Sequence, residues 1–351
     1  MIGCRISEGS VNGISSLVLE NDHIKVVVLA GKGSDIWELR HKPSDTDILW
    51  KTPWGVRNPN SYVPDTSSSH AMFLDLYPGG WQELLPNGGA ACTYRGAELG
   101  FHGELCKIPW EYQIVHENEK RVAVRFYTRT VRIPFRVEKT LRLERDCATL
   151  FIEETVTNEG TSAMDFMWGH HPAFGPPFVS EDCRLFVPAR SVETAKAFGG
   201  RQILPAETHF KTYPLIKTAS GENFDLSRVL PPSAQISNVV YLSDLEEGWS
   251  CLVNENSRIG VAMHWDLRVF PYVWLVQEYC GTSDYPWWGR AYLVSIEPQS
   301  SIPAMGLEKA IDRGTNLTLA SGKSISTELC VSTFLASGSP ASVSPDGTVR
   351  Y

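Results

Sequence analysis

The sequence lacks several features that would place it in a common functional class. No apolar run approaches the ~20 residues that a membrane-spanning helix needs, so we expect no membrane partner. The formal net charge is −8 and Lys and Arg form no run. Because nucleic-acid affinity depends on clustered cations that displace counterions, we expect no nucleic-acid partner. The opening segment MIGCRISEGSVNG has no basic stretch followed by an apolar one, so no secretory leader is expected.

Paired cysteine motifs are also missing. The eight cysteines are irregularly spaced and include no CxxC pair. In a chain without a secretory leader, this pattern indicates reduced thiols in the cytoplasm rather than disulfides, and it disfavours a zinc site.

Long amphipathic helices are scarce, and 22 prolines and 28 glycines are spread through the chain. The dominant period is two, which is typical of half-buried antiparallel strands. From this alternation we predict strands over Phe135–Glu144, Arg121–Val131 and Leu150–Thr157. In the first of these, Lys139 breaks the alternation. We also predict a strand over Ile24–Leu29, because its continuous β-branched run is typical of a strand covered on both faces. The pattern predicts an all-β protein, a large antiparallel β-sandwich.

The 351 residues and 42% hydrophobic content are enough for a large core, and no repeat of 20–50 residues is visible. We predict one domain over residues 1–335, with two long functional loops at Asn58–Gly89 and Gln202–Pro232. The Ser-, Pro- and Gly-rich residues 336–351 are expected to form a loose tail.

Three short segments place a titratable group among aromatic and glycine residues: Gly100–Glu104 with His102, Trp168–Gly175 with two histidines, and Val294–Gln299 with Glu297. In an extended segment His170 and His171 face opposite sides, so neighbours of this kind do not readily chelate one metal. Each group also has an ordinary interpretation, as a loop histidine, a buried histidine at a strand end, or a carboxylate at the surface.

The order of the motifs is more specific than any one of them. The series runs Gly79-Gly80-Trp81, Leu85-Pro86-Asn87, Phe101-His102-Gly103, Gly169-His170-His171-Pro172-Ala173-Phe174 and Ile296-Glu297-Pro298. It resembles the aldose 1-epimerase family in its broader galactose mutarotase-like form, over roughly Leu17 to Leu335.

This resemblance implies a galactose mutarotase-like supersandwich with an open sugar cleft. It implies that Glu297 removes the proton of the anomeric hydroxyl, that His171 protonates the ring oxygen, and that His102 positions the substrate. The family aspartate that holds sugar hydroxyls has Asn238 as its candidate replacement here, and Arg95 is only a loose candidate for the family arginine.

Eleven tryptophans are available to stack on the apolar faces of a sugar. Trp274 is the first choice, because its predicted strand precedes that of Glu297, and Trp81 is a further candidate; Trp110, Trp287 and Trp288 are also considered.

Anomer exchange requires only a base and an acid on either side of the hemiacetal, so neither a metal nor another cofactor is expected. For this chemistry Glu297 is expected to be ionised and His171 protonated near neutral pH, since opposite charges close together favour that state. The expected partner is a small-molecule sugar, an aldohexose or a derivative. The oligomeric state is left open, with a homodimer as one option.

Two other functions remain open at this stage. A glycoside hydrolase or lyase would need a second carboxylate about 5–10 Å from the first, and Glu83 or Glu104 are candidates. The alternative is a non-catalytic sugar-binding protein on the same fold, because fold alone does not establish turnover.

Overall fold

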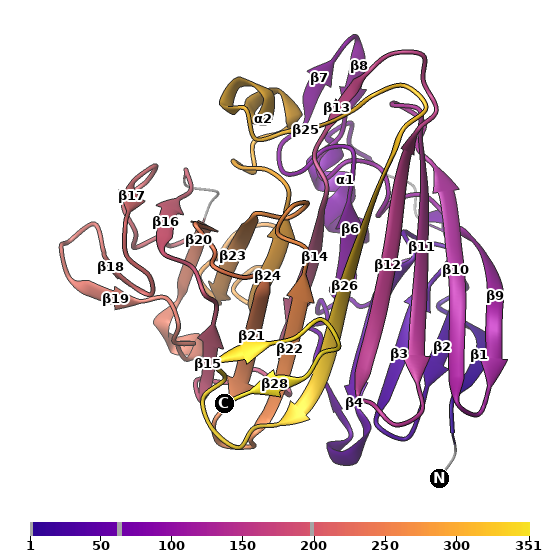
Figure 1. Ribbon diagram of the computed structural model, residues 1–351. Coiled ribbons are helices and arrows are strands. Elements are labelled where there is room, and N and C mark those ends of the chain that lie inside the picture. The colour runs from indigo at the N-terminus through magenta and orange to yellow at the C-terminus, as the bar shows by residue number, and fades with distance from the viewer. Residues whose placement is uncertain (1–2, 62–64, 197–199) are drawn as a thin grey trace.

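The computed structural model describes residues 3–61, 65–196 and 200–351. Two large antiparallel sheets pack face to face (Figure 1) and confirm the predicted β-sandwich. The first sheet runs in the order β1 (Arg5–Val11), β2 (Ile14–Glu20), β3 (Ile24–Leu29), β4 (Asp35–His41), β6 (Trp81–Leu84), β14 (Gly169–Phe174), β24 (Tyr292–Gln299), β23 (Tyr272–Tyr279), β20 (Ile236–Ser243), β16 (Ser191–Thr194) and β17 (His209–Phe210), with β5 (Thr46–Asp47) beside β4.

The second sheet has eight strands and covers one side of the first, which we call the inner face. Its order is β15 (Cys183–Phe186), β21 (Trp249–Asn254), β22 (Ile259–Trp265), β26 (Ser324–Leu335), β12 (Thr149–Asn158), β11 (Phe135–Glu144), β10 (Arg121–Arg129) and β9 (Glu111–Asn118). The opposite side of the first sheet is its outer face.

The remaining elements are short. Four small hairpins or strand pairs are β7 (Cys92–Tyr94) with β8 (Ala97–Leu99), β13 (Met164–Phe166) with β25 (Leu317–Leu319), β18 (Leu215–Lys217) with β19 (Asn223–Asp225), and β27 (Ser342–Val343) with β28 (Val349–Arg350). The α-helices of the described residues are α1 (Ser69–Leu76) and α2 (Leu307–Arg313), and neither has the length or the apolar character to cross a membrane.

The predicted strands correspond to β3, β10, β11 and β12. Alternation along the last three matches one buried face, and the continuous apolar run of β3 matches burial on both faces. The exception to alternation, Lys139, is buried in the sandwich core. Its ammonium lies 3.3 Å from a carboxylate oxygen of Glu83 on β6 and donates to Ser34 O. The residue that breaks the pattern therefore links the two sheets through a buried ion pair.

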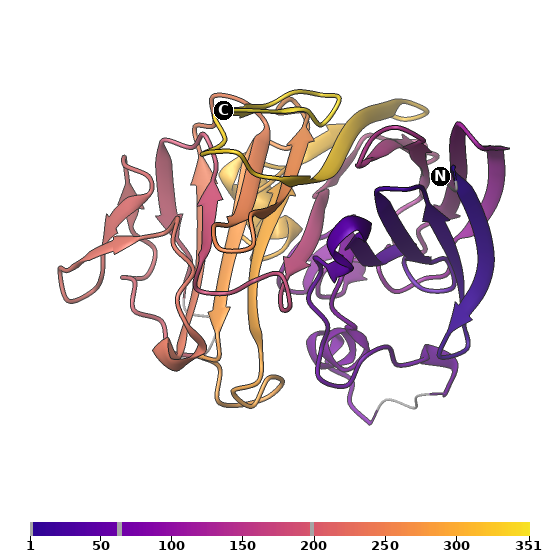
Figure 2. The ribbon, with the colours of Figure 1, turned by 90° about the horizontal axis from the view of Figure 1, so that it is seen from below.

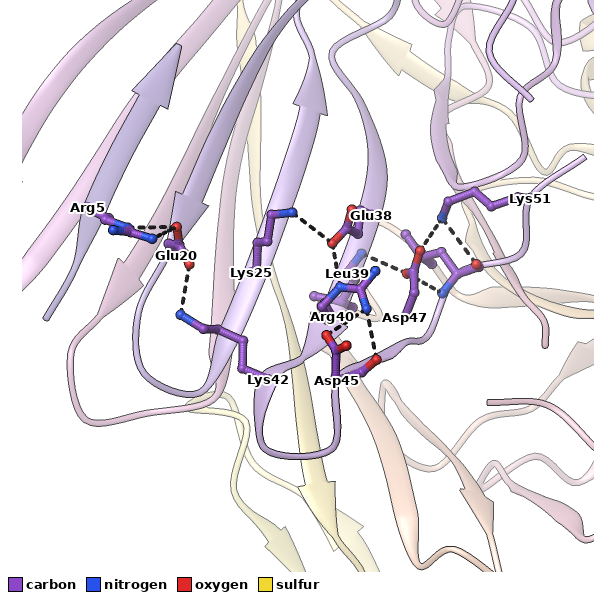
Figure 3. Close-up of polar contacts among 11 residues, drawn as sticks. Arg5, Glu20, Lys25, Glu38, Leu39, Arg40, Lys42, Asp45, Asp47 and Lys51 are labelled. Atoms are coloured by element: carbon purple, nitrogen blue, oxygen red, sulfur yellow. Dashed lines mark hydrogen bonds and ion pairs between the residues drawn. The ribbon is translucent and has the colours of Figure 1, made fainter. Parts of the chain in front are cut away.

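The solvent side of the N-terminal strands carries a lattice of opposite charges (Figure 3). Its ion pairs are Arg5–Glu20, Lys42–Glu20, Lys25–Glu38, Arg40–Glu38, Arg40–Asp45 and Lys51–Asp47. Cross-strand pairs of opposite sign stabilise a sheet modestly. The charges at this end of the outer face are therefore paired with one another.

Two loop predictions are refined by the structure. The Asn58–Gly89 segment contains α1 and β6, while its residues 62–64 lie outside the described residues. The Gln202–Pro232 segment contains β17, β18 and β19. All eight cysteines are free thiols in this structure.

The C-terminal segment 336–351 differs from the expected loose tail. It folds back as the β27–β28 hairpin, and Val343 is buried against a small cluster that includes Trp249 and Cys251. Burial of apolar side chains stabilises the hairpin, which a composition rich in Ser and Gly did not reveal.

Candidate active site

Strand register brings the two predicted acid–base groups, Glu297 and His171, to one place on the outer face. Trp274 on β23 lies opposite Glu297 on β24. The pairs Gly169–Gln299 and Ala173–Ser295 place His171 of β14 on the other side of Glu297. His171 Nε2 is 3.5 Å from Glu297 Oε1, and the glutamate side chain is only 1% exposed.

His102 approaches from the loop that follows β8. Its backbone is left-handed, with φ of 59°, and its ring centroid lies 5.0 Å from that of His171. The N–H of Gly89 donates to His102 Nδ1 over 3.1 Å. Burial holds the pKa of His102 well below 6.5. Because Nδ1 accepts, the single proton of the neutral ring is on Nε2, and His102 can only donate there.

The carboxyl group of Glu297 is held by its neighbours two residues away on β24. Gln299 Nε2 donates to Oε2 over 3.2 Å. Ser295 Oγ lies 2.5 Å from Pro172 O and 2.9 Å from Glu297 Oε1. The carbonyl of Pro172 can only accept, so the hydroxyl proton of Ser295 is used there. The contact between Ser295 Oγ and Glu297 Oε1 is then a hydrogen bond only if Glu297 is protonated and donates to Ser295.

Burial moves the pKa values of the pair in opposite directions. Loss of solvent raises the pKa of Glu297 to about 8, and the hydrogen bond from Gln299, which lowers it, offsets this only in part. The same loss of solvent lowers the pKa of His171 to about 4. Near neutral pH the carboxyl group is therefore protonated and the imidazole neutral, which differs from the ion pair expected from sequence. Desolvation outweighs the attraction between the two charges.

Aromatic rings from α1 and its C-terminal end cover the two histidines. The ring of Phe73 lies 4.8 Å from that of His102, and the ring of Tyr77 lies 5.7 Å from that of His171. Tyr77 in turn contacts Trp287, at 6.2 Å between centroids. These rings account for the low exposure of the site. The short apolar pattern of α1 gave no sequence signal for this role.

The loop between β23 and β24 holds α1 in place. Figure 2 shows this loop and α1 along the same edge of the molecule. The hydroxyl of Tyr285 lies 3.0 Å from Asp75 Oδ1, and Trp287 stacks on Trp54 at 5.6 Å. Helix and loop therefore form one cover over the site.

Of the proposed stacking tryptophans, Trp274 lies beside Glu297 and Trp81 does not. Trp274 is 3% exposed, and its indole N–H donates to Ser301 O over 2.9 Å. The indole N–H of Trp81 donates to Nδ1 of His170 over 3.1 Å. His170 Nε2 lies 3.0 Å from Glu154 of the second sheet, so Trp81 belongs to the inner face.

Asn238 and Arg95 are not brought to the site either. Asn238 pairs with Gln277, which is three residues from Trp274 along β23, an odd number, so the side chain of Asn238 points to the inner face. There it accepts from Ile203 N over 3.3 Å. Arg95 donates to Ala163 O over 2.9 Å in an exposed contact.

The two further carboxylates considered for a glycosidase also lie elsewhere. Glu83 is on the inner face, where it accepts from Trp168 Nε1 over 2.9 Å. Glu104 accepts from the backbone N–H groups of Val131 and Arg132. Within the described residues, no three His, Cys, Asp or Glu side chains are grouped to hold a metal ion.

Residues 11–333 match the family described as "Domain of unknown function (DUF4432)". The chain belongs to this family. No curated protein sequence is significantly similar to it.

Solved structures with the same architecture are numerous. A protein from Klebsiella pneumoniae named a putative aldose 1-epimerase has a TM-score of 0.72 at 14% identity, over 94% of this chain and 87% of that one. A galactose mutarotase related enzyme from Lactobacillus acidophilus has a TM-score of 0.61 at 16% identity, over 91% and 97%. A galactose mutarotase-like protein from Clostridium acetobutylicum has a TM-score of 0.60 at 14% identity, over 95% and 99%.

At these identities the similarity establishes the fold. This DUF4432 member therefore has the galactose mutarotase-like fold that its sequence motifs predicted.

Proposed function

We propose that this protein is an aldose 1-epimerase, which interconverts the α and β anomers of an aldohexose or a derivative. The observation that carries the proposal is the buried pair of Glu297 and His171, whose oxygen and nitrogen are 3.5 Å apart with His102 beside them. Between their two pKa values this pair holds one proton. One base and one acid are what hemiacetal opening needs.

In the first step a base takes the proton of the C1 hydroxyl, the C1–O5 bond breaks, and the acid protonates O5. In the neutral pair, His171 is the base and Glu297 is the acid. Opening then leaves the imidazolium and the carboxylate. This order reverses the roles expected from sequence, in which Glu297 takes the C1 proton and His171 protonates O5. Rotation about C1–C2 and reclosure by the reverse transfers yield the other anomer and restore the pair. Each group therefore acts once as acid and once as base.

The surrounding groups suit a sugar rather than a charged or wholly apolar ligand. His102 offers Nε2–H to a hydroxyl, and Trp274, Phe73 and Tyr77 offer ring faces to C–H groups. Glu297 is almost fully buried. A sugar therefore reaches the pair only when the cover formed by α1 and the β23–β24 loop shifts.

The two alternatives make different demands. A glycoside hydrolase needs a second carboxylate facing the substrate, and Glu83 and Glu104 are both committed to other contacts. A non-catalytic sugar-binding protein needs no proton on the pair, so the matched pKa shifts of Glu297 and His171 favour catalysis over binding alone.

Proton NMR exchange spectroscopy on a panel of aldoses tests the proposal. We expect wild type to accelerate exchange for at least one sugar, and Glu297→Gln and His171→Asn each to lose about 10²–10⁴-fold without loss of the folded circular dichroism spectrum. Glu153→Gln, a change of the same type at a half-exposed site on β12, is the control. Equal rates for wild type and both site variants on every sugar would reject the assignment; release of reducing ends from oligosaccharides would favour a hydrolase.

A further inference from the structure

The row of residues that contains the acid–base pair continues beyond His171 onto two more strands. His171 of β14 lies opposite Gln82 of β6. The pair Ile36–Trp81 places Asp35 of β4 opposite Gln82 in the same register. Residues directly opposite each other share a face of the sheet. Gln82 is therefore the neighbour of His171 on the side away from Glu297.

The amide of Gln82 has a fixed orientation. Its Nε2 donates to Gly79 O over 2.8 Å and to Asp35 Oδ2 over 3.2 Å. Both N–H bonds are used, so the oxygen and nitrogen of the amide cannot exchange places without losing them. Lys32 Nζ donates to the same Asp35 Oδ2 over 2.5 Å, which holds the carboxylate that orients the amide.

The other amide atom is left without a partner. Gln82 Oε1 is fully buried and accepts no hydrogen bond from the described residues, and His171 Nδ1 beside it has no hydrogen-bond partner among them either. Buried acceptors are normally satisfied by protein, water or ligand. Asp35 Oδ1 is also unpartnered, but it lies against Gly33, where an added Cβ would come within 2.2 Å. The role of Asp35 is therefore to orient Gln82.

We propose that Gln82 is a substrate-positioning residue whose Oε1 accepts a hydrogen bond from a hydroxyl of the sugar held at Glu297 and His171. The inference rests on the proposed function and deepens it. Adjacent strands are about 4.8 Å apart, which is close to the width of a pyranose ring, so a sugar over His171 reaches both Glu297 and Gln82. An acceptor oriented by a carboxylate selects a donor. The substrate class is a sugar with a free hydroxyl at this position, and a phosphate or carboxylate there is rejected.

The test compares Gln82→Met with Gln277→Met. Gln277 is a second buried glutamine with an unpartnered Oε1, but it lies on the inner face and donates to Leu226 O. We expect Gln82→Met to raise KM for anomer exchange about tenfold or more, with kcat changed less and the pH limits unchanged. Gln277→Met should leave KM unchanged. An unchanged KM in folded Gln82→Met for every aldose would overturn the proposal.

A second measurement needs no variant at this position. Wild type is tested on a series of monodeoxy aldoses, and one hydroxyl should account for a loss of about tenfold or more in kcat/KM; equal rates across the series would also overturn the proposal. Binding of the same sugars to Glu297→Gln, measured by saturation-transfer NMR, separates the proposed catalysis from the proposed positioning role of Gln82. Sugar binding that depends on Gln82 without turnover in wild type would reject only the proposed catalysis. Neither binding nor turnover would reject both.

Discussion

His171 Nε2 and Glu297 Oε1 face each other at 3.5 Å across two neighbouring strands, and burial places the pKa of the imidazole at about 4 and that of the carboxyl at about 8. Between these values the pair carries one proton. Below the lower value both groups are protonated and the base is missing. Above the higher value both have lost their protons and the acid is missing.

The first prediction is therefore a bell-shaped dependence of kcat/KM on pH, with limbs near pH 4 and near pH 8. It is measured by anomer-exchange rates after subtraction of the spontaneous reaction. The remaining activity of Glu297→Gln should lack the alkaline limb. An acid limb near 6.5, the ordinary value for histidine, would show that His171 is not desolvated in the working enzyme.

A second prediction concerns His102. Its pKa is held well below 6.5 and its Nδ1 is occupied by Gly89, so it should position the substrate without titrating. We expect His102→Gln to raise KM about tenfold and to leave both pH limbs in place. Movement of the acid limb in this variant would instead assign His102 to proton transfer.

A third prediction concerns stability at alkaline pH. The folded-state pKa of Glu297 lies above its ordinary value of 4.5. Its protonated form therefore contributes stability that is fully present below pH 4.5 and is lost as pH rises through about 8.

Glu297→Gln removes this dependence. The free energy of unfolding of the variant, relative to wild type, should increase by about 1.4 kcal/mol for each pH unit between 4.5 and about 8, the ordinary and the folded-state pKa of Glu297. Urea denaturation at several pH values measures it, with Glu153→Gln as the half-exposed control. A difference that stays constant with pH would mean that the carboxyl group is solvated.

A fourth prediction concerns Gly169, which lies opposite Gln299. An added Cβ at this glycine would come within 1.8 Å of Gln299 Oε1, so Gly169→Ala must displace the side chain that donates to Glu297. We expect a loss of about tenfold or more in kcat and about 1–3 kcal/mol in stability. Gly9→Ala is the control, because its Cβ would lie 3.8 Å from the nearest atom, Ser16 Oγ. Equal activity of the two variants would argue against the role of Gln299.

A fifth prediction concerns the C-terminal hairpin. Val343 is 3% exposed and packs against Trp249 and Cys251, whereas Val131 is 79% exposed. Val343→Ala should lower the free energy of unfolding by about 2 kcal/mol, and Val131→Ala should change it by less than about 0.5 kcal/mol. Urea denaturation compares them directly; equal effects would mean that the hairpin is loosely attached in solution.

Alternation was enough to predict β10, β11 and β12, because each of these strands buries one face, and a continuous β-branched run was enough for β3, which buries both. It could not explain Lys139, whose partner Glu83 comes from the other sheet. Nor could it predict the faces of Trp81 and Asn238. For these residues the face depends on the register with a distant strand, and a shift of one residue reverses it.

The motif order brought Glu297, His171 and His102 together correctly, but it could not give their protonation. That state depends on solvent removal by Phe73, in a helix of eight residues, and by Tyr77, which directly follows that helix. Ser295 and Gln299 were within reach of sequence reasoning, since both are two residues from Glu297 and so share its face. Gln82 was not predicted, because sequence reasoning selected its neighbour Trp81 as the sugar-contacting residue of this segment.

His170 and His171 of β14 are consecutive and face opposite sides of the sheet, so an insertion or deletion in this strand would disrupt the contacts of both. His170 is anchored to Glu154 across the sandwich while His171 meets Glu297 on the opposite side. Gain or loss of one residue before them would exchange their environments, so that the histidine of the core would face the outer side and the histidine of the acid–base pair would face the core. Within β6, β14 and β24, engineering should therefore use substitutions rather than insertions or deletions, because substitutions keep the pairing register of the three strands.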